Sequence, residues 1–540
     1  MFFLIDDLYN KLNKSSEILI YGAGLYANEV YPVLKKMGLK TKIKSFVVTS
    51  TEHELEEIDG IPVRAFDEER ILNLESYTLL IAVNKKNSYE ILESLQENKF
   101  QTIVLLIDYI LLNIEELGRV SQELFLKYII DGYIWKEAKT IEEFRTKRNN
   151  IRELISKRES EDVDKKTIVF IIGSPNPRLL KIIGALIRRG YKITALGYGT
   201  WGVYDKLTKA ELLSYSIEFF QCENILELLY FSIRHKPIVY YFEPMWGDCS
   251  WANIMIRHES LFGKVVISLY DVLNDSYVQA SDYQKILERY CLENASGIVW
   301  RYFSKEFLQD RKGFAYKGKS IHFLDYCNEF NGEKTENQES VVKLCYICGD
   351  TYNVLSENHK NESVYSEVAR LDKILEKIGN RNDCVFHVFA GTASDRDKNI
   401  CRILTEKYSN FQIFYSIPHS QLIRRISEYD FGCFLYTSGL IMPEMMSIDN
   451  QYYGSAYINS VSNRYFDYIE AGIPIIATRP IKLCDLFEGL GIIVKMNIEN
   501  IDITFLKRNR KYFKEKVSIA RDNFLIDKQI QKLIDFFQEL

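Results

Sequence analysis

Apolar and polar positions follow a strand and helix rhythm that repeats along most of the chain. Residues 17–38, EILIYGAGLYANEVYPVLKKMG, contain an apolar strand, a glycine turn and a helix that ends at Gly38. Further apolar strands and a helix near residues 87–98 continue this order to about residue 115. Such alternation is typical of a parallel sheet covered by helices, so we predict a small Rossmann-like domain over residues 1–115.

A charged stretch separates this domain from two larger α/β segments. Residues 116–165 place Glu or Asp near Lys or Arg at helical spacing, which predicts a helical connector. The strand and helix alternation then resumes twice, and the chain closes with an amphipathic helix. We therefore expect an α/β protein of three Rossmann-like units, with a ligand in the cleft between the last two. The predicted boundaries are 166–335 and 336–515 for these two units, and 516–540 for a final helix that packs back on the domains.

The length, composition and net charge of the chain argue against some classes of function. At 540 residues the chain is too long for one hydrophobic core, and 47% hydrophobic with 26% charged residues is the composition of a folded protein. A net charge of -5 without a basic stripe argues against nucleic acid as a partner. The first residues do not resemble a signal peptide, and no apolar run reaches the length of a membrane span. We expect a cytoplasmic protein, with contact at an inner membrane face left open.

The glycine turn of the first domain has the spacing of a dinucleotide-binding loop. Gly22 and Gly24 are followed by Ala27, which satisfies the pattern in its G/A form. The second strand ends at Thr49, where the pattern places an acid for a ribose. The segment resembles the small Rossmann-like domains attached to sugar-modifying enzymes and sugar-nucleotide acyltransferases. A cofactor loop that binds NAD and a purely structural sheet domain both stay open.

The third unit carries a series of motifs in a fixed order. These segments are YICGD, ARLDKILEKI, FHVFAGT, IPHSQLIRRISEYDFGCFLYTS and NRYFDYIEAGIPIIAT. Their order and spacing resemble the nucleotide-sugar half of GT-B glycosyltransferases, in the retaining group similar to family four. The resemblance implies a GT-B architecture over residues 166–540, in which the second unit holds the acceptor and the third unit holds the donor.

The last of these motifs, residues 463–478, predicts a helix followed by a buried strand. The free N–H groups and partial positive charge of the helix start suit a diphosphate, and Arg464 suits a charge-assisted contact with the same phosphates. The resemblance implies that Asp467 accepts hydrogen bonds from the donor ribose, and that Asn463 and Gly349 also line the nucleotide site. The alternative is that Asp467 only stabilises the helix and Arg464 is a solvated cation.

Other candidate positions lie at the ends of predicted strands. The family's frequent earlier acid falls on Asn459, which the resemblance assigns to the donor sugar. Gly173 and Ser174 occupy the place of a glycine loop under the donor phosphates and acceptor. Asp271 matches a family aspartate that could hold an acceptor hydroxyl or act as a base, and a loop-capping aspartate is the alternative. Glu243 lies at a similar edge, where a lone Glu is more often structural.

Two short motifs look like metal sites but favour other roles. Asp395 and Asp397 form a DxD sequence at the start of a charged helix, so a surface helix-capping pair is the better interpretation. Cys345 and Cys348 form a CxxC inside an apolar run without a second ligand pair, which favours core packing over zinc. We predict no metal.

These observations lead to one hypothesis and two alternatives. The hypothesis is a metal-independent, retaining transferase that moves a sugar from a nucleoside diphosphate sugar to a glycan, lipid-linked or protein acceptor, with Asp271 and Arg464 as catalytic residues. It needs no cofactor besides this co-substrate. The first alternative is a sugar-nucleotide-binding or assembly protein without turnover, because Asn459 is neutral and a basic pair common in the family is not evident. The second is an NAD-binding sugar-modifying enzyme that uses residues 16–115. The oligomeric state is unknown from the sequence.

Overall fold

The computed structural model divides the chain into two compact units. The smaller unit comprises Met1–Asp162 with Asn224–Lys236 and Arg257–Phe262, and the remaining segments form the larger unit. The structure describes residues 2–49, 56–66, 74–95, 98–111, 114–159, 162–198, 203–243, 249–269, 272, 281–301, 308–310, 313–330, 340–350, 371–434, 463–477, 484–496 and 501–540.

The smaller unit contains a six-stranded sheet. Its elements are β2 (Glu17–Tyr21), α2 (Leu25–Lys36), β3 (Ile43–Val48), β4 (Glu57–Ile58), β5 (Ile61–Ala65), β6 (Tyr77–Ile81), α4 (Lys85–Ser94) and β7 (Thr102–Leu105). The strand order is β4-β5-β3-β2-β6-β7, and only β4 runs antiparallel to its neighbour. The chain starts in the middle at β2 and winds outward first to one side and then to the other. This doubly wound order places a switch point between β2 and β6.

Helices follow this sheet in the stretch predicted to be a connector, and they belong to the same compact unit as the sheet. They are α5 (Ile114–Leu117), α6 (Gln122–Glu137) and α7 (Ile141–Glu159), and they pack with α1 (Ile5–Leu12) and a strand pair, β1 (Phe2–Phe3) and β8 (Ile110–Leu111). The buried Arg148 side chain joins α7 to α6 and α1, because its Nε lies 2.7 Å from Asp131 Oδ1 and its Nη1 lies 2.7 Å from Asp6 Oδ2. The helical prediction for this stretch is confirmed.

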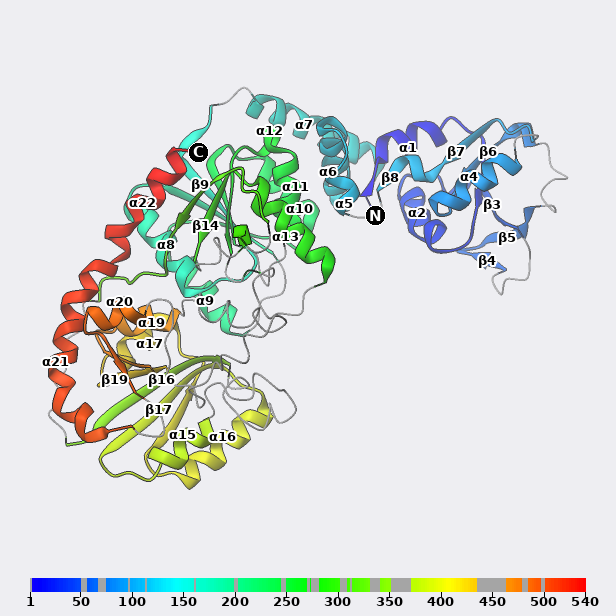
Figure 1. The fold of residues 1–540 in the computed structure, drawn as a ribbon. Helices are drawn as coiled ribbons and strands as arrows, with labels where there is room; N and C mark the ends of the chain where they lie inside the picture. The colour runs from blue at the N-terminus through cyan, green and yellow to red at the C-terminus, as the bar shows by residue number, and fades with distance from the viewer. Residues whose placement is uncertain are drawn as a thin grey trace. The chain divides into compact units, whose positions relative to one another are not determined.

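The larger unit begins with a seven-stranded parallel sheet (Figure 1). Its elements are β9 (Asp164–Ile172), α8 (Pro177–Arg188), β10 (Lys192–Gly197), α9 (Val203–Leu213), β11 (Glu218–Gln221), β12 (Pro237–Glu243), α11 (Ser250–Arg257), β13 (Val265–Leu269), α13 (Asp282–Asn294), β14 (Gly297–Trp300) and β15 (Lys319–His322). The order β11-β10-β9-β12-β13-β14-β15 is doubly wound, with its switch point between β9 and β12.

A second, six-stranded parallel sheet follows in the same unit. Its elements are β16 (Val342–Asp350), α15 (Leu371–Ile378), β17 (Cys384–Thr392), α16 (Asp395–Lys407), β18 (Phe411–Tyr415), α17 (His419–Ile426), β19 (Phe431–Phe434), α19 (Asn463–Glu470), β20 (Ile475–Ala477), α20 (Cys484–Gly489) and β21 (Ile493–Lys495). The order β18-β17-β16-β19-β20-β21 repeats the doubly wound pattern, with its switch point between β16 and β19. The predicted α/β class with parallel sheets is confirmed.

Two helices complete the larger unit, α21 (Ile503–Arg521) and α22 (Ile526–Gln538). In Figure 1 α21 runs along the second sheet of this unit and α22 continues beside α8. Helix α22 packs closely against the first large sheet, because a Cβ on Gly297 of β14 would lie 2.7 Å from the ring of Phe536. The predicted final helix is therefore present, but the helical run begins at Ile503, so the expected boundary at residue 516 falls inside α21. No helix in the described parts of the chain is long and apolar enough to cross a membrane.

Candidate functional site

The loop after β9 lies at the switch point of the first large sheet. Gly173 donates its backbone N–H to the Glu243 carbonyl at 3.3 Å, which ties the end of β9 to the end of β12. Asn176 then caps α8, because its Oδ1 accepts a hydrogen bond from Leu179 N at 3.0 Å. Its Nδ2 donates to Glu243 Oε1. The sequence GSPNPR thus forms a short, fixed turn at the carboxyl edge of the sheet, where doubly wound folds hold their ligands.

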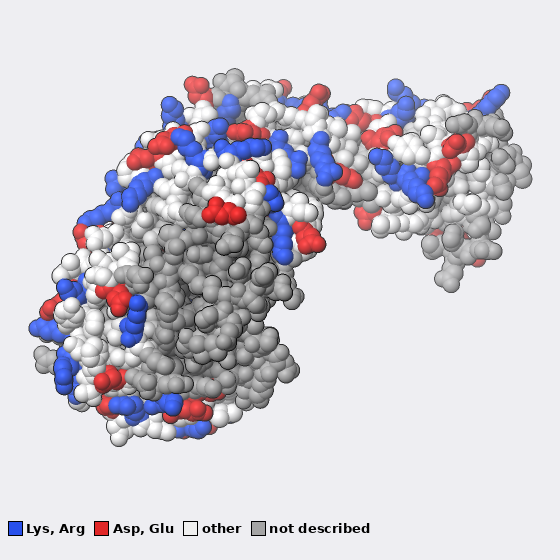
Figure 2. Space-filling view, viewed as in Figure 1, with Lys and Arg blue, Asp and Glu red and all other residues white. Residues whose placement is uncertain are grey.

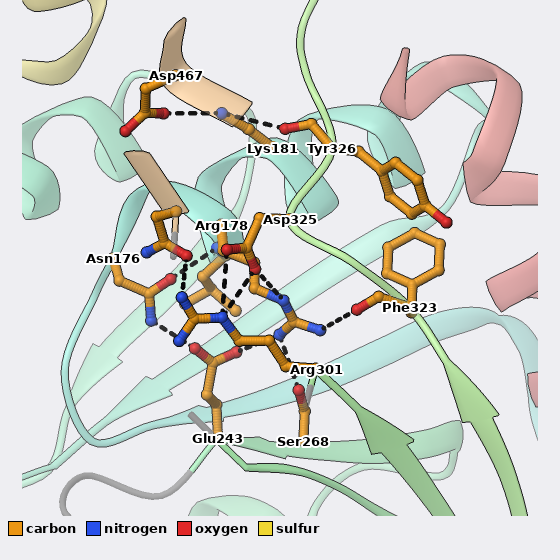
Figure 3. A network of polar contacts seen from close by, with 12 residues as sticks. Asn176, Arg178, Lys181, Glu243, Ser268, Arg301, Phe323, Asp325, Tyr326 and Asp467 are labelled. Carbon is orange, nitrogen blue, oxygen red and sulfur yellow. Dashed lines mark hydrogen bonds and ion pairs between the residues drawn. The ribbon is translucent and has the colours of Figure 1, made fainter. Parts of the chain in front are cut away.

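Arg178, in the first turn of α8, is the centre of a buried polar network (Figure 3). Its Nη1 donates to Ser268 Oγ at 2.8 Å and lies 3.4 Å from Glu243 Oε2, while its Nε lies 3.0 Å from Asp325 Oδ1. Burial raises the pKa of Glu243, and the positive charge of Arg178 opposes that shift. Asp325 follows β15, so the network fixes the chain segment that leaves the first large sheet.

Arg301 carries this network to the second large sheet. It stands at the end of β14, its Nε donates to Asp325 Oδ1 at 3.1 Å, and its Nη2 donates to Asn463 Oδ1 at the start of α19. Arg301 is only 3% exposed and Asn463 is half-buried, so the contact is partly shielded from water. A predicted donor-site residue, Asn463, is therefore oriented by a cation from the opposite half of the unit.

One turn further along α8, Lys181 meets two carboxylates of α19. Its Nζ lies 3.2 Å from Asp467 Oδ1 and 2.8 Å from Glu470 Oε2, and it donates to the Tyr326 carbonyl at 3.2 Å. His419 Nε2, at the start of α17, lies 3.0 Å from the same Asp467 Oδ1. All four charged or imidazole side chains are at most 8% exposed. Figure 3 shows the Lys181 ammonium between Asp467 and the Tyr326 carbonyl.

This arrangement fixes the ionisation and the orientation of Asp467. Burial alone would raise the pKa of Asp467, but the charges of Lys181 and His419 and their hydrogen bonds outweigh it and lower that pKa to about 2. The same carboxylates raise the pKa of Lys181 despite its burial. Both partners bind Oδ1, and among the described residues no donor contacts Oδ2. Asp467 is thus a fixed anion with one oxygen still able to accept hydrogen bonds.

Arg464 occupies the switch point of the second large sheet. Its Nη1 donates to the Tyr346 hydroxyl at 2.9 Å, and its guanidinium lies 5.4 Å from the Tyr346 ring centroid and 5.5 Å from that of Phe434. These rings belong to β16 and β19, the two strands that flank the switch point. Gly349 is exposed near the end of β16, where a Cβ would meet no atom within 4 Å. The side chain of Arg464 is half-buried, so a ligand at this edge could reach its cation.

Helix α19 is held in place by Tyr468. The Tyr468 hydroxyl accepts a hydrogen bond from Ile347 N and donates one to the Cys433 carbonyl, both at 3.0 Å. Gly432 allows the close approach, since a Cβ there would lie 2.3 Å from the Tyr468 ring. The helix ends at Glu470, and the chain turns at Gly472, whose φ of 75° few other residues tolerate. These contacts set the position from which Arg464 and Asp467 project.

The remaining predicted site residues fall into two groups. Asp271 and Asn459 lie outside the described residues, so their catalytic and sugar-binding roles stay predictions. Gly22 and Gly24 lie in the turn after β2 of the smaller unit. Gly22 has a φ of 113°, and a Cβ there would lie 2.8 Å from the Ala82 carbonyl oxygen, so packing against the end of β6 is sufficient reason for this glycine. Whether this turn binds a cofactor stays a prediction.

The metal-like motifs have other contacts. Ser394 caps α16 by accepting a hydrogen bond from Asp397 N at 3.1 Å, and Asp395 pairs with Lys398 at 3.1 Å. Cys345 and Cys348 are buried within β16. Across the described ranges, no group of three His, Cys, Asp or Glu side chains could hold a metal ion.

Sequence reasoning missed the partners of Asp467. Lys181 was visible as a cation inside PRLLKIIGALIR, a segment whose other positions near it are apolar, and buried lysines are rare unless paired. His419 stands within IPHSQL, a segment used for the family resemblance without regard to its imidazole. The sequence contains both signals, but nothing in it brings α8 and α17 to α19.

Two doubly wound parallel sheets within one unit, followed by a helix that returns to the first sheet, define the class of fold: the larger unit has the GT-B architecture. No family model and no curated protein matches the chain. Solved structures similar to it include the Anabaena protein HepE in complex with UDP, at 10% identity and a TM-score of 0.47, covering 69% of this chain and 100% of that one.

Two other similar structures have lower TM-scores. The lipopolysaccharide outer core galactosyltransferase WaaB is 11% identical with a TM-score of 0.41, covering 69% of this chain and all of its own. A UDP-N-acetylglucosamine 2-epimerase described as putative, from Listeria monocytogenes, is 9% identical with a TM-score of 0.40, covering 70% of this chain and 98% of its own. Similarities of this size do not assign an activity.

Proposed function

We propose that this protein is a glycosyltransferase that moves a sugar from a nucleoside diphosphate sugar to a glycan, lipid-linked or protein acceptor. The observation that carries the proposal is Asp467. Its carboxylate is ionised, held through Oδ1 by Lys181 and His419, and able to accept through Oδ2, one turn after the Arg464 guanidinium. A carboxylate beyond a cation and a helix start matches the chemistry of a ribose joined to a diphosphate.

In this proposal Arg464 and the start of α19 stabilise the negative charge that develops on the departing diphosphate. A charge-assisted hydrogen bond from a positioned guanidinium, in a site shielded from water, stabilises such a charge more strongly than water does. The cation needs no reorganisation, because Tyr346 and Phe434 already hold it at the sheet edge. Arg464 therefore acts on the leaving group. The predicted base or acceptor-binding residue is Asp271, and the reaction is proposed to be retaining and metal-independent.

Asp467 selects the nucleotide in this proposal. A carboxylate oxygen can accept hydrogen bonds from both hydroxyls of a ribose, whereas a protonated carboxyl would offer one acceptor fewer. The pKa of about 2 keeps Asp467 ionised at neutral pH. Lys181 and His419 act as positioning residues, because they touch Asp467 and not the donor. Gly349, with open space around its Cα, would let the nucleotide lie against the backbone at the end of β16.

Two variants of buried carboxylates on α19 test the proposal. Asp467→Asn should weaken binding of UDP-, GDP- or dTDP-sugars by about 1–3 kcal/mol, the usual effect of losing a hydrogen bond to a charged group. Glu470→Gln is the matched control, since Glu470 also pairs with Lys181 but has no proposed contact with donor. Calorimetric titration of each variant, followed by measurement of donor hydrolysis and transfer, gives the readout. Equal donor affinity in both variants would contradict the assignment of Asp467.

The neutral side chain at Asn459 favours a second candidate, a sugar-nucleotide-binding protein of the same fold without turnover. The same titration separates the two candidates. Donor binding with hydrolysis or transfer supports the transferase, and binding without either supports the binding protein. Binding of NAD alone would oppose both and favour the smaller unit as the ligand site.

A further inference from the structure

The outer face of α21 carries an apolar stripe. Phe505, Tyr512 and Ile519 are 40%, 52% and 72% exposed, although each is a large apolar or aromatic residue. They are spaced by seven residues, so they lie almost in line along the helix. At about 1.5 Å per residue, the stripe is about 21 Å long. Scattered exposed apolar residues are ordinary on protein surfaces, but three in register on one helix are not explained by chance exposure.

The same helix is strongly basic. The segment Ile503–Arg521 contains seven Lys or Arg residues and a single acid, Glu515, in a chain whose net charge is -5. Figure 2 shows Lys and Arg recurring along the edge of the molecule that α21 occupies in Figure 1. Charge of one sign concentrated on one element of an acidic protein points to a partner of the opposite sign.

Some of these cations serve the fold, and the others remain on the surface. Arg510 and Lys514 face inward, where they lie 3.6 and 3.1 Å from the buried carboxylate of Asp430. The outward cations make no ion pair with any described residue. Among them, Lys516 lies over the Tyr512 ring at 5.5 Å. The outward cations are the exposed Lys507, Arg508 and Lys511, together with Lys516, which is half-buried because its aliphatic chain packs beside Gly491.

The outward cations flank the apolar stripe on both sides. On a helical projection Arg508, Lys511 and Lys507 fall on one side of the line through Tyr512, and Lys516 falls on the other. An apolar line with three cations on one side and one on the other matches a membrane surface, where apolar side chains enter the acyl boundary and cations meet anionic headgroups. A nucleic acid would use the charge, but its bases stack on aromatic rings and offer no comparable partner for Ile519, the most exposed residue of the stripe.

We propose that the outer face of α21 docks onto an anionic phospholipid membrane surface. The contact does not compete with the candidate site, because Asp430, which anchors α21, precedes β19 at the amino edge of its sheet, while Gly349 lies near the carboxyl edge. The helix lies on the surface and does not span it. This inference is independent of sugar transfer, since none of its residues belongs to the site around Asp467.

Vesicle co-sedimentation of the full chain tests the proposal. We expect the protein to bind vesicles of phosphatidylcholine mixed with phosphatidylglycerol, to ignore phosphatidylcholine alone, and to dissociate as salt is added. Neutralising the outward cations as Lys507→Gln, Arg508→Gln, Lys511→Gln and Lys516→Gln should weaken binding by roughly fivefold per cation. The apolar variant Phe505→Ser, Tyr512→Ser and Ile519→Ser should weaken it by on the order of tenfold.

A matched control keeps the test specific. Tyr89→Ser, Leu213→Ser and Ile403→Ser remove three exposed apolar residues of similar exposure from other elements, and vesicle binding should be unchanged. Ile519→Ser alone, at the most exposed position, supplies a variant that cannot disturb the core. The proposal is overturned if anionic vesicles bind no better than neutral ones, or if the control loses as much binding as the apolar variant. It is also overturned if only the charge variant matters and duplex DNA binds α21 equally well, which would indicate a general polyanion surface.

Discussion

Lys181 provides the most direct test of the contact between the two large sheets. Lys181→Met keeps most of the aliphatic chain but removes the ammonium that lies 3.2 Å from Asp467 Oδ1 and 2.8 Å from Glu470 Oε2. Two carboxylates then remain buried, Asp467 with His419 and Glu470 with the backbone N–H of Asn328 as their other described partners. Removing one partner of a buried ion pair typically costs about 3–5 kcal/mol. The pKa shift of Asp467, from 3.8 to about 2, is the net of burial and of the Lys181 and His419 contributions and corresponds to about 2–3 kcal/mol, which is of the same order.

The pH dependence of the stability lost in Lys181→Met distinguishes the effect of an unpaired buried charge from that of a simple cavity. In the wild type the pKa of Asp467 is below its ordinary value, so its stabilising contribution is present above about pH 4 and is lost as the pH falls toward about 2. In Lys181→Met the charge that lowers the pKa of Asp467 most is gone, so burial raises this pKa instead and the folded variant binds a proton that the unfolded chain does not. The difference in unfolding free energy between the wild type and Lys181→Met should therefore be largest near pH 7 and smaller at about pH 5.

Urea unfolding at the two pH values measures this difference. Lys319→Met is the control, because the Lys319 and Glu539 side chains are 54% and 64% exposed and their pair should contribute less than about 1 kcal/mol. The triple variant Lys181→Met, Asp467→Asn, Glu470→Gln should recover much of the loss, since it leaves no buried charge unpaired. A deficit below about 1 kcal/mol for Lys181→Met, or one that stays constant between the two pH values, would refute the reasoning.

Three further predictions concern other parts of the molecule. Arg464→Gln should weaken binding of a nucleoside diphosphate by about 1–3 kcal/mol and leave binding of the free nucleoside unchanged, as measured by calorimetry. Gly22→Ala should destabilise the smaller unit by about 1–3 kcal/mol, because its φ is 113° and the Ala82 carbonyl blocks a Cβ; hydrogen exchange in β2 and β6 reports the loss. Phe537→Ala should cost about 3–5 kcal/mol in urea unfolding, because Phe537 is 2% exposed and lies 6.0 Å from the Tyr241 ring centroid.

Local patterns in the sequence were sufficient to predict α19. Gly472 and Pro474 marked the end of the helix, and the apolar run after them marked β20. The sequence did not predict which residues α19 contacts, because Lys181 and Asp467 are 286 positions apart in the chain. Periodicity reports which face of a helix is apolar, but it does not report which charged residue of a distant helix will share the same buried volume.

The C-terminal helical segment also has a feature that local sequence patterns did not predict. The apolar spacing predicted a helix through residues 516–540, and the structure interrupts it between α21 and α22. The interruption follows from a distant segment: Cys327 donates its N–H to the Phe524 carbonyl at 2.8 Å and accepts from Ile526 N at 2.7 Å. These two hydrogen bonds take the place of those within a continuous helix, and no pattern in the local sequence indicates them.

The hydrogen-bonded bridge at Cys327 also marks where the second large sheet could be separated from the rest of the larger unit. The chain leaves the first large sheet at this point and returns to it at Leu525, directly alongside. The whole second sheet is therefore an insertion whose two ends meet, and α22 belongs to the core of the half that surrounds it. Such closely spaced ends allow a segment to be exchanged as a cassette without stretching the host. A donor-binding half could thus be replaced between two neighbouring positions of the chain while the rest of the fold stays closed.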